Sequence, residues 1–321
     1  MISDQSLLEL FQKTLQKTIT VSEPRLLYEP IVYALQQGGK RIRPLLLLRS
    51  CEAFGGVITE ALYPAMGIEI FHNFTLLHDD IMDQAPLRRG QATVYQKYNS
   101  NIAILSGDAM FAIACSTMCN TKADKVSYVM QSFSKLSLEI CEGQQYDMDF
   151  ETQNSVTIAQ YMDMIKLKTS VLLGGALQIG AIIADASVEQ QRAIYEFGVN
   201  IGLAFQLQDD WLDVYSNTDT FGKIHGGDIL ARKKTFLYLK ALEVANEYQK
   251  QELVQYFADP KDKNIEYIVA IYDALNINKL TKEAMRLYHE KALIYLRQAS
   301  LPTEFSTYFK TLSEQLLERE K

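Results

Sequence analysis

Two stretches decide the fold: VLLGGALQIGAIIA at residues 171–184 and FGVNIGLAFQLQ at residues 197–208. Both are apolar almost all the way round a helical wheel, whereas a surface helix carries a single apolar stripe. Helices of this kind are buried on every side, so we expect central helices surrounded by amphipathic ones. The sequence therefore predicts a large all-α protein.

The placement of proline also favours long helices. The chain has 321 residues and seven prolines, none of them between residues 87 and 259. Proline inside a helix costs about 3 kcal/mol, so a long proline-free segment suits helices. Nothing in the composition marks a linker, and we expect one domain over residues 1–321. Apolar residues recur at spacings of three and four, so we expect no sheet. The same spacings predict helices over residues 4–18, 22–36, 44–55, 60–84, 94–99, 101–119, 123–151, 157–184, 188–216, 232–258, 262–276 and 278–318.

Composition narrows the location and the partners. With 39 acidic and 32 basic residues the formal charge is -7, which argues against a diffuse basic surface for nucleic acid. The four cysteines form no CxxC pair, which argues against a metal or redox site. The chain opens with the polar MISDQS, which is unlike a signal peptide. The longest apolar uncharged run, residues 169–184, falls short of the roughly 20 residues of a membrane span. We expect a cytoplasmic protein with reduced cysteines, no nucleic-acid partner and no membrane span.

Two acidic motifs stand out inside apolar helices. Each reads DDxxD, so its three carboxylates fan out over one helical turn, with the first and last about 40° apart and the middle one about 100° from the first. Burying uncompensated carboxylates costs several kcal/mol each, so the sequence calls for a cation. Oxygen ligands that leave coordination positions open favour Mg²⁺. The motifs are Asp79, Asp80 and Asp83 in HDDIMD, and Asp209, Asp210 and Asp213 in QDDWLD.

Basic residues accompany both motifs. A Gly-rich turn, GGKRIRP at residues 38–44, precedes a predicted helix and has the character of a phosphate cradle. No GxxxxGK[ST] motif is present, so it is not a P-loop. The recurrence of cations beside carboxylates predicts a site for Mg²⁺ and a phosphorylated substrate. These cations are Lys40, Arg41, Arg43, Arg88, Arg89, Lys168, Lys223 and Lys233.

In this order and spacing the motifs resemble the trans-isoprenyl diphosphate synthase family, the short-chain polyprenyl synthetases of the geranylgeranyl or farnesyl diphosphate synthase type. The resemblance runs from Gly38 to Thr235. It implies the isoprenoid synthase fold, a helical bundle around a deep central cavity, as a homodimer with three Mg²⁺ ions. It also implies head-to-tail condensation of isopentenyl diphosphate with dimethylallyl, geranyl or farnesyl diphosphate to an all-trans product.

The resemblance assigns roles to individual residues. Asp79, Asp83 and Asp209 would bind Mg²⁺ directly, and Asp80, Asp210 and Asp213 would complete the metal motifs indirectly or through water. One departure is Arg232, at a position where the family often has Gly before the lysine of GKxT. The allylic diphosphate would be held by Arg88, Lys168, Lys223 and Lys233; isopentenyl diphosphate by Gly39, Lys40, Arg43, His72 and Arg89; and the cavity wall would include Gln144, Asp147, Thr169, Phe205 and Gln206.

Product length should depend on what blocks the cavity below the first acidic motif. On the helical wheel Phe71 and Thr75 lie near the face of Asp79, whereas Phe74 lies far from it. The wheel thus favours Phe71 over Phe74 as the floor, with Thr75 small enough to let a chain pass. An aromatic five residues before Asp79, with no insertion in DDxxD, resembles the geranylgeranyl-forming type. We expect a twenty-carbon product, with fifteen carbons as the close alternative.

Other functions of the same fold are disfavoured by particular motifs. A terpene cyclase usually carries one DDxxD, so QDDWLD and the second diphosphate site in GGKRIRP argue against it. An inactive partner subunit or a structural helical protein would not need both acidic motifs with their cations.

Overall fold

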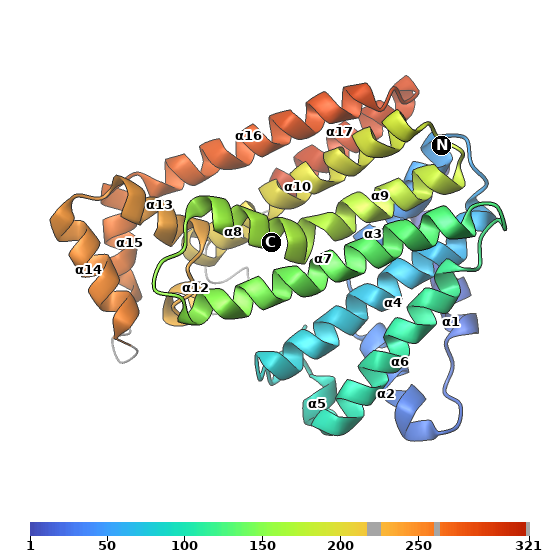
Figure 1. The fold of residues 1–321 in the computed structure, drawn as a ribbon, viewed down its shortest axis with the longest axis horizontal. Helices are drawn as coiled ribbons and strands as arrows, with labels where there is room; N and C mark the ends of the chain where they lie inside the picture. Colours follow the sequence, from blue (N-terminus) through green and yellow to red (C-terminus); the bar gives the residue numbers. More distant parts are fainter. Residues whose placement is uncertain (217–225, 260–263, 319–321) are drawn as a thin grey trace. The chain divides into compact units, whose positions relative to one another are not determined.

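Helices make up nearly all the regular structure of the protein (Figure 1). The structure, a computed structural model, describes residues 1–216, 226–259 and 264–318. Its all-α class confirms the prediction from the apolar pattern. The chain divides into two compact units, which are described separately: unit 1 comprises Met1–Lys135 and Gly175–Arg192, and unit 2 comprises Leu136–Gly174 and Ala193–Lys321.

Unit 1 is built around α3 and α4, which carry its most completely buried residues. Here α9 approaches α3 so closely that a Cβ on Gly180 would lie 2.2 Å from the carbonyl oxygen of Leu47, and Ser50 Oγ donates to the Leu177 carbonyl at 2.7 Å. The elements wholly within unit 1 are α1 (Asp4–Thr18), α2 (Arg25–Gln36), α3 (Ile42–Ala53), α4 (Ile58–Met82), β1 (Leu87–Arg88), β2 (Gln91–Ala92), α5 (Val94–Lys97) and α6 (Ser100–Met118).

Unit 2 has its core where α10 meets α8 and α13, around Leu203, Leu207 and Leu237. The helices α7 (Val126–Thr152), α9 (Val171–Ile183) and α10 (Val188–Tyr215) contribute residues to both units. The elements wholly within unit 2 are α8 (Ile158–Ile165), the π-helix η1 (Lys166–Ser170), α12 (Gly227–Leu230), α13 (Phe236–Val244), α14 (Glu247–Ala258), α15 (Ile265–Ala274), α16 (Ile277–Gln298) and α17 (Thr303–Glu318).

Three predicted helices prove to be interrupted. The segment 157–184 contains the five-residue π-helix η1. The segment 232–258 was wrong as one helix, because Asn246 starts α14 with a capping box that satisfies exposed backbone N–H groups. The segment 278–318 was also wrong as one helix, because Ser300 takes a positive φ of 54° just before Pro302, which cannot continue a helix. Local capping thus overrides continuous apolar spacing.

The expectation of no sheet misses one small element. Leu87 pairs with Ala92 and Arg88 with Gln91 in an antiparallel hairpin. The two central residues, Arg89 and Gly90, have φ values of 53° and 75°, as a type I′ turn requires.

Two helices are long and apolar enough to span a membrane by length and composition alone, Ser100–Met118 and Ile158–Ile183. In the second, 72% of the apolar window is buried within the protein, as expected for a core helix. Buried core helices of soluble proteins pass the same length test, so the prediction of no membrane span stays a prediction.

Candidate active site

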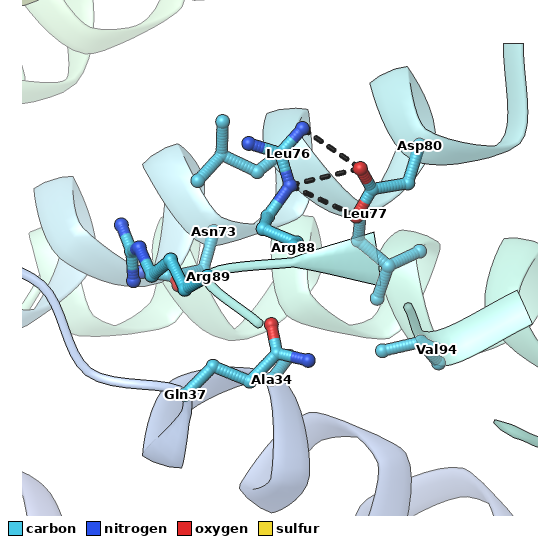
Figure 2. Close-up of a pocket in the computed structure, with 9 residues that line it drawn as sticks. All are labelled: Ala34, Gln37, Asn73, Leu76, Leu77, Asp80, Arg88, Arg89 and Val94. Carbon is cyan, nitrogen blue, oxygen red and sulfur yellow. Dashed lines mark hydrogen bonds and ion pairs between the residues drawn. The ribbon is translucent and has the colours of Figure 1, made fainter. Parts of the chain in front are cut away.

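The hairpin after α4 directs two arginines to different places. Because side chains alternate along a strand and its turn, Arg88 reaches Asp80 while Arg89 extends away from it (Figure 2). Arg88 Nε donates to both carboxylate oxygens of Asp80, at 2.8 and 3.0 Å, and Arg88 Nη2 lies 2.7 Å from Asp80 Oδ1. Burial raises the pKa of Asp80, and the bonds from Arg88 act in the opposite direction.

These bonds separate the roles of the first three aspartates. Asp80 is buried and held by Arg88, whereas Asp79 is half-buried and Asp83 is exposed at the end of α4. The Asp83 amide donates to the Asp79 carbonyl at 2.8 Å, so the two residues lie one helical turn apart. The indirect role predicted for Asp80 agrees with this geometry.

The Gly-rich turn before α3 places one arginine in the core of unit 1. Gly38, Gly39 and Arg41 all have positive φ values, of 87°, 127° and 51°, a region that favours glycine. Arg89 Nη1 donates to the Gly38 carbonyl, which joins this turn to the hairpin. Lys40 is exposed.

Arg41 has a structural role instead of the phosphate-binding role expected from its motif. Its guanidinium forms a buried ion pair with Glu69 of α4 and donates to the Leu35 carbonyl. Glu69 also accepts from Asn73 Nδ2 at 3.0 Å. Two of the basic residues of GGKRIRP, Lys40 and Arg43, therefore remain as candidates for binding an anion.

Arg43 and His72 lie together in a cationic cluster whose other members are Arg41, Arg88 and Arg89. Arg43 Nη1 lies 3.1 Å from His72 Nε2, and the buried Nε of Arg43 has no hydrogen-bond partner among the described residues. Burial, followed by the charges of Arg43 and Arg89, holds the pKa of His72 well below its usual range. His72 is therefore neutral and accepts from Arg43, and the cluster offers donors to an anion.

Four aromatic rings gather on the helices of unit 1. Phe71 is fully buried and its ring centroid lies 5.6 Å from that of Phe74, 6.1 Å from that of Phe111 and 5.2 Å from that of Phe133. Phe74 and Thr75 are half-buried, and Thr75 donates to the His72 carbonyl at 2.8 Å. The half-buried Phe74 thus packs against the fully buried ring of Phe71.

In unit 2, the middle aspartate of the second motif is also held by the protein. Tyr161 of α8 donates to Asp210 Oδ2, and Gln206 Nε2 lies 3.4 Å from Asp210 Oδ1. Burial, followed by the charge of Asp228, raises the pKa of Asp210 to about 8. Burial and Asp210 raise the pKa of Tyr161 well above its usual range, so Tyr161 keeps its proton and donates. Asp209 and Asp213 are half-buried.

The π-helix η1 carries the two residues of the KT motif. Lys168 Nζ lies 2.5 Å from Asp147 Oδ2 on α7, and Thr169 Oγ1 lies 3.5 Å from Gln206 Oε1 on α10. A π-turn inside a helix often marks a functional site. Gly143 lets α7 approach η1, because a Cβ there would lie 2.3 Å from the amide nitrogen of Lys168. The half-buried Gln144 follows Gly143 on α7, and Phe205 is half-buried on α10.

The last aspartate of the second motif supports the segment that carries Lys233. Asp213 Oδ2 accepts from the Asp228 amide at 2.9 Å, and Lys233 Nζ lies 3.8 Å from Asp228 Oδ1. Lys234 caps the end of α7, with Nζ donating to the carbonyls of Phe150 at 2.6 Å and Gln153 at 2.8 Å. Lys223, predicted to bind substrate, lies outside the described residues.

The carboxylates of both motifs fit Mg²⁺ that completes its shell with substrate. In the described ranges 1–216, 226–259 and 264–318, no three His, Cys, Asp or Glu side chains form a group that could hold a metal ion. Mg²⁺ is typically bound by one or two carboxylates, with water and phosphate oxygens in the other positions. Asp79 with Asp83, and Asp209 in the second motif, match that requirement.

Sequence reasoning missed several residues that shape the site. Tyr161 lies 49 positions from Asp210, Gly143 acts through its missing side chain, and Glu69 pairs with a residue 28 positions away. An acidic residue in an apolar helix, such as Glu69, is a visible signal, since a buried carboxylate needs a partner. Tyr161 and Gly143 carry no comparable signal.

Comparison with known proteins shows which family this sequence resembles. Residues 24–275 match the sequence model of the polyprenyl synthetase family. The chain is 39% identical over 231 residues to a geranylgeranyl diphosphate synthase of Methanosarcina mazei, covering 71% of each protein. It is 34% identical over 298 residues to a geranylfarnesyl diphosphate synthase of Natronomonas pharaonis, covering 87% of this chain and 86% of the relative.

The fold is also similar to that of solved structures. A crystal structure of geranylgeranyl pyrophosphate synthase superimposes with a TM-score of 0.95 and 43% identity, covering all of both chains. A second, from Pyrococcus horikoshii, gives a TM-score of 0.92 at 34% identity over 98% of this chain and 97% of the other. This chain belongs to the polyprenyl synthetase family.

Proposed function

We propose that this protein is a prenyltransferase that condenses isopentenyl diphosphate with dimethylallyl, geranyl or farnesyl diphosphate into a short-chain all-trans polyprenyl diphosphate. The observation that carries this proposal is the contact between the half-buried Arg43 and His72, which lie in the same unit as the Asp79 motif. An arginine whose Nε has no hydrogen-bond partner among the described residues favours an anion. A carboxylate pair favours a hard cation. A diphosphate with Mg²⁺ supplies both.

The residues have distinct tasks in this reaction. Asp79, Asp83 and Asp209 would hold three Mg²⁺ ions, as the family resemblance implies, and these ions would stabilise charge on the departing allylic diphosphate. Lys168, Lys233, Lys223 and Arg88 bind the same diphosphate, and Arg43, His72, Arg89, Lys40 and Gly39 bind that of isopentenyl diphosphate.

Carbon–carbon bond formation needs no protein nucleophile. The carbon–oxygen bond of the allylic diphosphate breaks, the double bond of isopentenyl diphosphate attacks the allylic cation, and the departing diphosphate takes the proton that is lost. The preorganised cations stabilise the negative charge that develops. Apolar wall residues such as Phe205 keep water away from the cation.

The proposed product is geranylgeranyl diphosphate, with twenty carbons. Phe74 offers half-buried ring surface above the fully buried Phe71, and we infer that the two rings together form the floor that stops elongation. Relatives with names that specify twenty-carbon and twenty-five-carbon products support a product in this range, and farnesyl diphosphate remains the alternative.

One incubation separates the candidate reactions. The protein is supplied with isopentenyl diphosphate, dimethylallyl diphosphate and Mg²⁺, and products are resolved by chromatography after dephosphorylation. Geranylgeraniol supports the proposal, farnesol supports the shorter synthase, and a cyclic hydrocarbon indicates a terpene cyclase. No turnover, with inorganic pyrophosphate still bound in the presence of Mg²⁺, indicates an inactive subunit.

Variants of the floor test product length separately. Phe74→Ala and Phe71→Ala should each lengthen the product, because each removes a ring from the aromatic cluster. The floor assignment is wrong if both variants make the same product as the wild type.

We also infer a homodimer in the cytoplasm, formed through α6. Ile104, Leu105 and Phe111 are 44%, 60% and 38% exposed along this helix, and a stripe of exposed apolar side chains favours a protein interface. Light scattering should give twice the chain mass, and Leu105→Glu should shift it toward the monomer. A wild-type monomer would contradict the inference.

A further inference from the structure

The turn between α12 and α13 has a backbone geometry that normally calls for glycine. The Lys233 amide donates to the Asp228 carbonyl at 3.0 Å and the Arg232 amide to the Ile229 carbonyl at 3.1 Å, which is the Schellman pattern of a helix end. The residue at its left-handed position is Arg232, with φ of 57°. At this position arginine has backbone strain that glycine would not have, because a Cβ disfavours a positive φ.

The side chain of Arg232 makes three contacts that glycine could not make. Its Cζ lies 4.0 Å from the ring centroid of Tyr256 on α14, a cation–π distance. Nη2 donates to the Asp259 carbonyl at 2.8 Å, and Nη1 donates to the Ile229 carbonyl at 3.1 Å. Tyr256 is 3% exposed, so the guanidinium rests on a fixed surface. Arg232 therefore connects the end of α12 to α14.

The segment fixed in this way carries residues of the proposed site. On one side, the Asp228 amide is bonded to Asp213, the last aspartate of the second motif. On the other side, Lys233 follows Arg232 directly. The position of Lys233 thus depends on how firmly the Schellman turn is held.

We propose that Arg232 is a positioning residue for Lys233. Its contacts with Tyr256 and Asp259 hold the turn in a single conformation, so that Lys233 is presented to the allylic diphosphate without reorganisation. The proposal rests on the proposed function for the identity of the ligand, but the ordering of the turn is a property of the protein alone. This role requires no contact between Arg232 and the substrate.

The test compares variants that remove the contacts with variants that keep them. Arg232→Gly preserves the left-handed backbone but loses every side-chain contact, and Tyr256→Leu removes the ring. Tyr256→Phe keeps the ring and removes only a hydroxyl that has no hydrogen-bond partner in the part of the chain that the structure describes. Ser300→Gly, at another positive-φ position with φ of 54° in the turn before α17, controls for relief of backbone strain.

Two measurements are made on each full-length variant. By hydrogen exchange, the Lys233 amide should exchange about tenfold faster in Arg232→Gly and Tyr256→Leu, because local opening becomes easier. In steady-state kinetics, the KM for the allylic diphosphate should rise about fivefold while that for isopentenyl diphosphate changes less than about twofold. Tyr256→Phe and Ser300→Gly should match the wild type in both measurements.

The outcomes distinguish the two proposals. Wild-type exchange at Lys233 and a wild-type allylic KM in Arg232→Gly would overturn the positioning role. An equal rise in both KM values would also overturn it, since a merely structural defect has no preference between substrates. If neither the wild type nor any variant transfers prenyl groups, the proposed function is wrong. The exchange rate of the Lys233 amide still decides whether Arg232 orders the turn. Should Tyr256→Leu not fold, Arg232→Gly alone carries the test.

Discussion

Replacing Gly143 with alanine should harm this protein, although the same change in an ordinary helix is favourable. Alanine is preferred to glycine in a helix interior by about 1 kcal/mol. At this position the new Cβ would lie 2.3 Å from the amide nitrogen of Lys168 and 2.7 Å from its Cα and from the carbonyl carbon of Leu167. All three are backbone atoms, so α7 and η1 must move apart.

The size of the effect follows from that movement. Ordinary van der Waals contact begins near 3.4 Å, so the backbones must separate by about 1 Å, and overpacking of this kind costs about 1–3 kcal/mol. Because it outweighs the gain in helix propensity, we expect a net loss of about 1 kcal/mol in the free energy of unfolding. Since η1 carries Lys168 and Thr169, a misplacement of about 1 Å should lower kcat/KM by about 100-fold.

The assay pairs urea unfolding, followed by circular dichroism, with steady-state kinetics. Glu142→Ala, at the exposed neighbouring position of α7, is the matched control and should change stability by less than about 0.5 kcal/mol. A Gly143→Ala protein that is more stable than the wild type and equally active would refute the reasoning, because it would mean that η1 accommodates the methyl group without moving.

Three further changes test separate parts of the structure. Glu69→Gln leaves the buried Arg41 without its counter-ion and should lower the free energy of unfolding by about 3–5 kcal/mol; a urea midpoint equal to that of the wild type would contradict this. Tyr161→Phe removes the donor to buried Asp210 and should cost about 1–3 kcal/mol, and it should reduce the thermal shift caused by Mg²⁺ with inorganic pyrophosphate; an unchanged shift would argue against a role in ordering the motif. Burial lowers the pKa of His289, so its folded state binds fewer protons and the wild type should lose stability as the pH falls below about 6.5; His289→Gln should lose less between pH values of about 7.5 and 5.5, and equal losses in urea unfolding would contradict the burial argument.

Patterns that repeat along the chain were sufficient for the class of the fold and for the kinds of residue in the site. Helical periodicity and the lack of proline between residues 87 and 259 indicated an all-α protein, because proline interrupts the backbone hydrogen bonds of a helix. The two DDxxD motifs and their cations indicated Mg²⁺ and a phosphorylated substrate, because like charges in apolar helices need a counter-ion. The family resemblance implied indirect roles for Asp80, Asp210 and Asp213, and in the structure Asp80 and Asp210 are hydrogen-bonded to protein side chains.

Contacts between residues far apart in the chain could not be predicted from these sequence patterns. Nothing near Asp210 in sequence indicates Tyr161, and nothing near Lys168 indicates that Gly143 must lack a side chain. In the sequence, Arg232 was only a departure from the glycine that the family often has there. The structure shows that Tyr256, on another helix, packs against its guanidinium. Periodicity records which face of a helix is apolar, because burial acts on each helix separately. The partner of a buried polar group depends on packing between helices far apart in the chain, and so only the folded protein specifies it.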